Sequence, residues 1–169
     1  MPLPQPNRAP TPTTGPTAQG PRIKTDMEPC PVVPSSLGHP AYSQTMPCAP
    51  ESARRARLLV SAACNAWGLP GLADSAALVV SELVGNSVRH SGSYQVRVVV
   101  SLPARGRVRV AVVDKSRTPP TLRVADDSEE DGRGLAVVEA LADRWGTEIL
   151  RWGKRVWVEL RPDETDGGQ

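Results

Sequence analysis

Two valine-rich stretches, separated by a short turn, constrain most strongly what this chain can fold into. Apolar residues occupy every second position from residue 96 to 102 and again from 108 to 112, with mostly polar or small residues between them. Alternation with a period of two and β-branched side chains is typical of strands that have one buried face. The segment Pro103-Ala104-Arg105-Gly106 joins the stretches, so the pattern predicts an antiparallel hairpin.

Helical periodicity appears on both sides of this hairpin. Apolar residues at helical spacing predict helices over residues 52–67, from 72 or 73 to 90, and over 135–144. Further strands are expected at residues 41–46, 147–151 and 155–160, the last two joined by a turn at Trp152-Gly153-Lys154. Three helices on one face of a mostly antiparallel mixed sheet form an α/β (α+β) two-layer sandwich, which is the predicted fold class.

Composition divides the chain of 169 residues into one domain and two tails. Most of its 18 prolines lie in the first fifty residues. Residues 1–40 show no apolar period, and such a segment is expected to be disordered because it buries too little surface to offset chain entropy. Residues 163–169 are predicted to form a solvated acidic and glycine-rich tail. Residues 41–162 then form a single compact domain.

The charge balance and hydropathy exclude some classes of function. The net charge of +2 argues against a nucleic-acid binder driven by phosphate neutralisation. The predicted outer sheet face carries Arg97, Arg107, Arg109 and Arg155, for which a solvated or protein-binding surface is favoured. No segment has the ~18 apolar residues of a membrane helix, and the N-terminus lacks the apolar core of a secretory signal. We therefore expect a cytoplasmic protein that contacts neither nucleic acid nor membrane directly.

The second predicted helix carries a polar stripe. Glu82, Asn86, Arg89 and His90 fall on one side of it, within about 100° of one another. Gly85 lies inside the helix, where it costs roughly 1 kcal/mol relative to alanine, and we expect it to leave room beside Glu82. A solvated amphipathic face is one interpretation. The other is a phosphoryl-transfer site. A carboxylate can take a proton from a hydroxyl, an amide oxygen can bind Mg²⁺, and a guanidinium can stabilise phosphate charge.

Asp114 is a second candidate site residue. If the strand stays regular, Asp114 lies on the same face as Val110 and Val112, beneath the helices. A carboxylate there is costly unless it is hydrogen-bonded, and the exocyclic amine of adenine is one possible donor. The alternative is that the strand ends at Val113 and Asp114 turns outward as a loop cap.

A long irregular segment precedes the third predicted helix. Residues 115–131 are rich in charge and proline without an apolar period, which is typical of a functional lid. Gly132-Arg133-Gly134-Leu135 then opens the helix. Its paired glycines would let backbone amides approach a phosphate at the helix N-terminus, although a flexible hinge is the alternative.

Taken together, these motifs resemble a known family. Glu82-x-x-x-Asn86-x-x-x-His90, then Asp114, then Gly132-Arg133-Gly134-Leu135 resemble the boxes of the GHKL ATPase superfamily, which has the Bergerat-type ATP-binding fold. Within it, the chain is similar to the anti-sigma-factor serine/threonine kinases over about residues 41–160. Two positions depart from the family pattern: residues 114–118 contain no glycine, and Arg155 stands where a threonine or serine near the phosphates is usual.

The resemblance implies a role for each of these residues. Glu82 matches the general base, Asn86 the Mg²⁺ ligand and Asp114 the carboxylate that reads adenine. The remaining residues expected to bind the nucleotide are Arg89, His90, Ser116, Gly132, Arg133, Gly134 and Leu135.

The resemblance also implies a function. It suggests a Mg-ATP-dependent kinase that phosphorylates an anti-sigma-factor antagonist, binds a sigma factor and forms a homodimer. A second hypothesis is an ATP-binding switch that sequesters a partner with little or no phosphoryl transfer. A histidine kinase is disfavoured, because His90 lies too near Asn86 to be the phosphoacceptor.

Overall fold

The computed structural model describes residues 38–120 and 133–163. Most of the predicted N-terminal tail (1–37), the later part of the predicted lid (121–132, with Gly132) and residues 164–169 lie outside the described residues. The elements, in chain order, are β1 (Ala41–Pro47), α1 (Ser52–Ala66), the short 3₁₀ helix η1 (Pro70–Leu72), α2 (Ala73–His90), β2 (Gln95–Ala104), β3 (Arg107–Asp114), α3 (Arg133–Leu141), β4 (Arg144–Ile149) and β5 (Lys154–Leu160).

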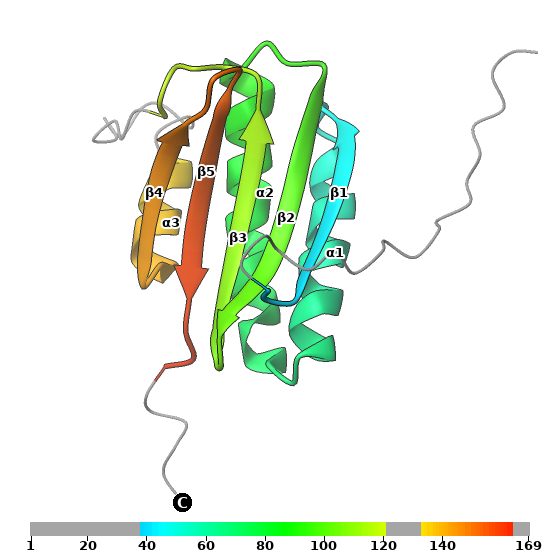
Figure 1. Cartoon of the computed structure of the whole chain (residues 1–169), viewed down its shortest axis with the longest axis vertical. Helices are drawn as coiled ribbons and strands as arrows, with labels where there is room; N and C mark the ends of the chain where they lie inside the picture. Colours follow the sequence, from blue (N-terminus) through cyan, green and yellow to red (C-terminus); the bar gives the residue numbers. More distant parts are fainter. Residues whose placement is uncertain (1–37, 121–132, 164–169) are drawn as a thin grey trace, which may run out of the picture.

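The strands form one five-stranded sheet in the order β1-β2-β3-β5-β4. Every neighbouring pair is antiparallel. The helices cover one face of this sheet, with α2 behind its centre (Figure 1). The predicted two-layer α+β sandwich is therefore confirmed, and the described sheet is antiparallel throughout rather than mixed.

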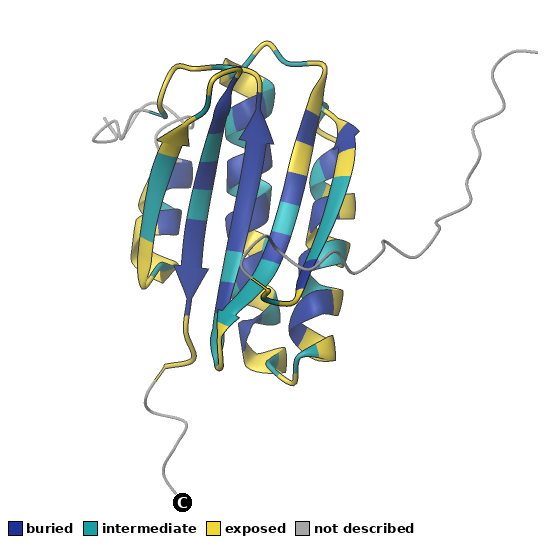
Figure 2. Ribbon diagram, in the orientation of Figure 1, coloured by how far each residue is buried: buried dark blue, intermediate teal, exposed yellow. Residues whose placement is uncertain are grey.

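The core lies between the valine-rich hairpin and the two longest helices. Val98, Val100, Val108 and Val110 are completely buried, as their alternation predicted. Figure 2 shows β3, the central strand, buried along most of its length. Gly106 closes the hairpin with a φ of 72°, a conformation that glycine adopts without steric cost.

Several boundaries near the C-terminus differ from the prediction, since β4 ends at Ile149 instead of residue 151, β5 begins at Lys154 instead of 155, and two larger differences precede them. The third helix ends at Leu141 instead of residue 144, and the next strand begins at Arg144 instead of 147. The Asp143 amide donates to the Glu159 carbonyl at 2.9 Å, so pairing with β5 begins directly after the helix. Trp145 packs against the core from this strand, and tertiary contact thus overrides the helical pattern of residues 142–144.

The outer face of the sheet holds a buried carboxylate. The side chain of Glu159 is only 1% exposed and accepts hydrogen bonds from Arg107, Arg109 and Arg144. Burial acts to raise the pKa of this carboxyl, but the hydrogen bonds from Arg144 and Arg109 outweigh burial, so the pKa is lowered. Arg109 also stacks on the ring of Trp157, 4.6 Å from its centroid. No helix among the described residues is long and apolar enough to cross a membrane.

Candidate functional site

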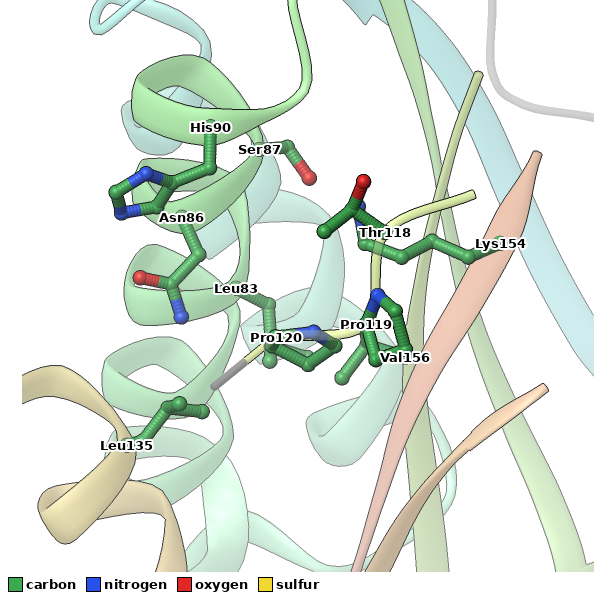
Figure 3. Close-up of a pocket in the computed structure, with 10 residues that line it drawn as sticks. All are labelled: Leu83, Asn86, Ser87, His90, Thr118, Pro119, Pro120, Leu135, Lys154 and Val156. Atoms are coloured by element: carbon green, nitrogen blue, oxygen red, sulfur yellow. The ribbon is translucent and has the colours of Figure 1, made fainter. Parts of the chain in front are cut away.

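A cavity of about 310 Å³ lies between α2, α3 and β5. Figure 3 shows its walls, with α2 on one side and β5 on the other. Its lining comes from α2 (Leu83, Asn86, Ser87, His90), from the chain after β3 (Thr118, Pro119, Pro120), from α3 (Leu135) and from β5 (Lys154, Val156). This size falls within the range of about 300–1,000 Å³ that small-molecule sites occupy, and apolar walls with few polar groups are usual for such sites.

Asp114 is buried at one end of this cavity. Strand β3 continues through Asp114, which pairs with Lys154 of β5, and the residue is 2% exposed. Its Oδ2 accepts from the Ser87 hydroxyl at 2.7 Å. Its Oδ1 accepts from the Ser116 amide at 2.9 Å and from the Lys154 ammonium at 3.0 Å. The prediction that Asp114 lies beneath the helices is confirmed, and the outward loop cap is wrong.

Ser87 and Lys154 stand between Asp114 and the cavity. Both line the cavity, whereas Asp114 lies behind them. Gly153 lets β5 approach this closely, because a Cβ at that position would collide with the Asp114 carbonyl oxygen. The close backbone approach thus fixes Lys154, the next residue, against the carboxylate.

The polar stripe of α2 divides between the cavity and the surface. Asn86 and His90 line the cavity. Arg89 is exposed and donates to the Asn86 Oδ1 at 3.0 Å. A Cβ on Gly85 would lie 3.2 Å from the Arg89 guanidinium. The Arg89 side chain is thus the neighbour that packs against Gly85 in this structure.

Glu82 contacts the start of α3. It is half-buried and not part of the cavity wall. Its Oε2 lies so near Gly134 that a Cβ there would collide with it, and Gly134 is buried. The carboxylate is thus held at the N-terminal end of a helix, where the helix dipole favours negative charge. The second glycine of the predicted box is needed for this approach.

The other predicted residues have mixed positions. Leu135 lines the cavity, and Arg133 begins α3. Ser116 contacts the site through its amide bond to Asp114, and its hydroxyl accepts from the Thr118 amide at 3.2 Å. Gly132 lies outside the described residues.

Arg155, which the family resemblance aligned with a threonine or serine near the phosphates, does not line the cavity. It pairs with Glu148 on the outer face at 2.8 Å, while Lys154 faces the cavity.

Two polar residues of the site, Ser87 and Lys154, were not among the predicted site residues. Ser87 lies on the apolar side of α2, away from the polar stripe, and that side meets Asp114. Lys154 was placed in a turn, although its position directly after Gly153 and before the alternating residues of β5 was a usable signal. Among the described residues no three His, Cys, Asp or Glu side chains cluster as a metal site, so the protein atoms there do not form a complete cation cage.

Comparison with protein families agrees with this geometry. Residues 46–161 match the histidine kinase-like ATPase domain, a range that covers most of the chain and includes every described residue of the cavity. No curated protein matches the chain significantly. On the strength of the family match, which joins the helix, strand and glycine motifs into one ATP-binding domain, the chain belongs to the histidine kinase-like ATPase family.

Proposed function

We propose that this protein is a Mg-ATP-dependent serine/threonine protein kinase of the anti-sigma-factor type. The observation that carries the proposal is the arrangement around one cavity, with Asn86 on its α2 wall, Asp114 buried at one end and Glu82 held against α3. In this proposal the base of ATP lies toward Asp114, and the phosphates lie toward Asn86 and the N-terminal end of α3.

Asn86 is the proposed protein ligand of Mg²⁺. Magnesium is commonly held by one or two protein oxygens together with substrate phosphates and water. A single amide oxygen therefore fits, even though the described residues form no cation cage. When bound, the ion would neutralise phosphate charge. Arg89, which donates to the Asn86 Oδ1, is the residue proposed to contact a phosphate.

Glu82 is the proposed general base. The hydroxyl proton of a substrate serine or threonine passes to its carboxylate, and the hydroxyl oxygen bonds to the γ-phosphorus. The bond from that phosphorus to the bridging oxygen breaks, and ADP leaves. A base must lie within hydrogen-bond reach of the proton that it takes. The contact between Glu82 and Gly134 places the carboxylate at a helix end of the kind that binds phosphates.

The proposed substrate is an anti-sigma-factor antagonist, and the proposed second partner is a sigma factor. The family resemblance supports both, as it supports a homodimer. The outer sheet face, with its arginines around Glu159, lies on the other side of the sheet from the cavity and is the surface proposed for a protein partner. Light scattering of the purified full chain would test the dimer.

Calorimetric titration with ATP and Mg²⁺ tests the binding part of the proposal. We expect ATP to bind in the micromolar range, and Asn86→Ala and Asp114→Ala to weaken binding strongly. Leu78→Ala, at an exposed position on the same helix, is the matched control and should leave binding unchanged. No ATP binding, or binding that both site variants retain in full, would exclude this site.

Transfer of the γ-phosphate tests the kinase part. The protein is incubated with γ-labelled ATP and candidate antagonist proteins, and label is expected on a serine or threonine of one of them. Glu82→Gln should abolish the label while ATP binding remains.

The alternative function is an ATP-binding switch that sequesters its partner. Two contacts favour it, since Lys154 covers the Asp114 carboxylate and Arg89 engages the Asn86 oxygen, and phosphoryl transfer needs accurate positioning. ATP-dependent partner binding that persists in Glu82→Gln, with no label transferred by the wild type, would favour the switch over the kinase.

A further inference from the structure

A buried ion pair lies at the polar end of the cavity. The Lys154 and Asp114 side chains are 7% and 1% exposed, and the ammonium nitrogen lies 3.0 Å from Oδ1. Removing two charges from water is costly, and apolar replacements of such pairs are often neutral or stabilising. Fold stability alone is therefore a weak reason for a lysine at this position, and its place on the cavity wall suggests contact with a ligand.

The hydrogen-bond inventory shows what this end of the cavity can offer. A lysine ammonium has three donors, and among the described residues only Asp114 accepts one. The Ser87 hydroxyl gives its proton to Asp114 Oδ2, so its remaining lone pairs are acceptors. A ligand in the cavity thus meets an ammonium donor beside a hydroxyl acceptor, with the carboxylate behind both.

Apolar walls flank this end of the cavity and suit the apolar faces of a base. Leu83 lies one turn before Ser87 on α2, and Val156 follows Lys154 on the same face of β5. In Figure 3 the Lys154 side chain extends from β5 in the direction of α2. Its charged end therefore reaches the region between the strand and the helix, where the edge of a base would lie.

We propose that Lys154 determines base specificity by donating a hydrogen bond to N1 of adenine. The neighbouring N6 amine donates to the Ser87 oxygen or to the remaining lone pair of Asp114. Asp114 acts largely as a positioning residue, because it holds the lysine and the serine in place. Guanine in the same orientation presents an N1 hydrogen to the ammonium, so two donors oppose each other. This inference rests on ATP binding in the proposed site.

Replacing one atom of the ligand tests this without any protein variant. The probe is 1-deaza-ATP, in which a C–H group replaces N1 and the N6 amine remains. A hydrogen bond to a charged donor contributes about 1.5–3 kcal/mol. The full-length wild type should therefore bind 1-deaza-ATP about 10- to 100-fold more weakly than ATP in calorimetry. GTP should also bind more weakly than ATP.

Two variants locate the effect on the protein. Lys154→Met should weaken ATP binding and bring the affinity ratio of ATP to 1-deaza-ATP close to one. Lys115→Met, at an exposed lysine next to Asp114, should keep the wild-type ratio. If Lys154→Met fails to fold because Asp114 loses its partner, Lys154→Met combined with Asp114→Asn removes both charges, and its ratio should also be close to one.

The outcomes separate this inference from the proposed function. No ATP binding by the wild type would overturn both. Equal binding of ATP and 1-deaza-ATP, or of ATP and GTP, would overturn the role of Lys154 and leave the ATP site intact. Tighter ATP binding by Lys154→Met would also overturn it, because the ammonium would then obstruct the base.

Discussion

Replacing Glu159 by glutamine tests whether the buried carboxylate on the outer face organises the sheet. Glutamine keeps the shape of the glutamate side chain and one accepting oxygen. Its NH₂ group, however, replaces the second oxygen and faces guanidinium donors, from which it cannot accept a hydrogen bond. About two charge-assisted hydrogen bonds are lost, each worth about 1.5–3 kcal/mol. The arginines are 25%, 34% and 57% exposed and can regain water, which reduces the loss. We expect the free energy of unfolding to fall by about 3 kcal/mol, the lower end for a broken buried pair.

Urea unfolding followed by tryptophan fluorescence measures this change, and Trp157, which stacks with Arg109, is a natural reporter. The melting temperature should fall by about 10 °C. Glu148→Gln is the matched control, because its partner Arg155 and Glu148 itself are 43% and 47% exposed, and surface pairs contribute about 0–1 kcal/mol. An equal, small effect of both substitutions would refute the reasoning.

The free energy of unfolding of the wild type and of Glu159→Gln should depend differently on pH. The pKa of Glu159 is lower in the folded protein than its unfolded value of about 4.3. The stability that it contributes is therefore complete above that pH and is lost as the pH falls through the folded pKa. The difference in the free energy of unfolding between wild type and Glu159→Gln should be constant at about pH 6 to 7 and should shrink below about pH 4. A difference that grows on acidification would contradict this assignment.

Three further predictions concern the site and the core. Ser87→Ala removes the 2.7 Å bond to Asp114 and should lower the free energy of unfolding by about 2 kcal/mol in urea titration; an unchanged midpoint would deny that bond its role. Gly134→Ala should weaken ATP binding about tenfold in calorimetry, because the new Cβ collides with Glu82 and the start of α3 must move. Adding Glu82→Ala should restore the affinity, and a failure to do so would point to another cause. Val110→Ala, fully buried in β3, should cost about 2 kcal/mol in the same urea assay, and a loss below about 0.5 kcal/mol would mean that the core collapses around the gap.

The architecture was largely predictable because its main elements carry strong periodic patterns. Valines occupy alternate positions on the core face of β2 and β3. Continuing this alternation predicted the correct face of the sheet for Asp114. The helix face with Asn86 and His90 was equally readable. The predicted start of β4 was wrong because residues 142–144 continue a helical pattern, and only pairing with β5 ends it.

The details of the site depend on contacts between distant segments, which one-dimensional patterns do not contain. Asp114 and Ser87 are 27 positions apart, and Asp114 and Lys154 are 40 apart. The contact of Arg89 with Gly85 depends on a rotamer that spacing cannot reveal. Glu159 was also hidden, since its burial results from arginines on two neighbouring strands.

Consecutive residues of strand β5 face two different environments, the cavity and the outer face of the sheet. Lys154 and Val156 face the cavity, while Arg155 and Glu159 face the opposite side. A slip of one residue would exchange these sets and drive Arg155 and Glu159 into the helix-covered layer. The length of the turn before β5 therefore determines the register of the strand, and with it which residues face the cavity. Deleting or inserting a single residue there would scramble the ligand site and the outer ion network at once, whereas substitutions on either face leave the other intact.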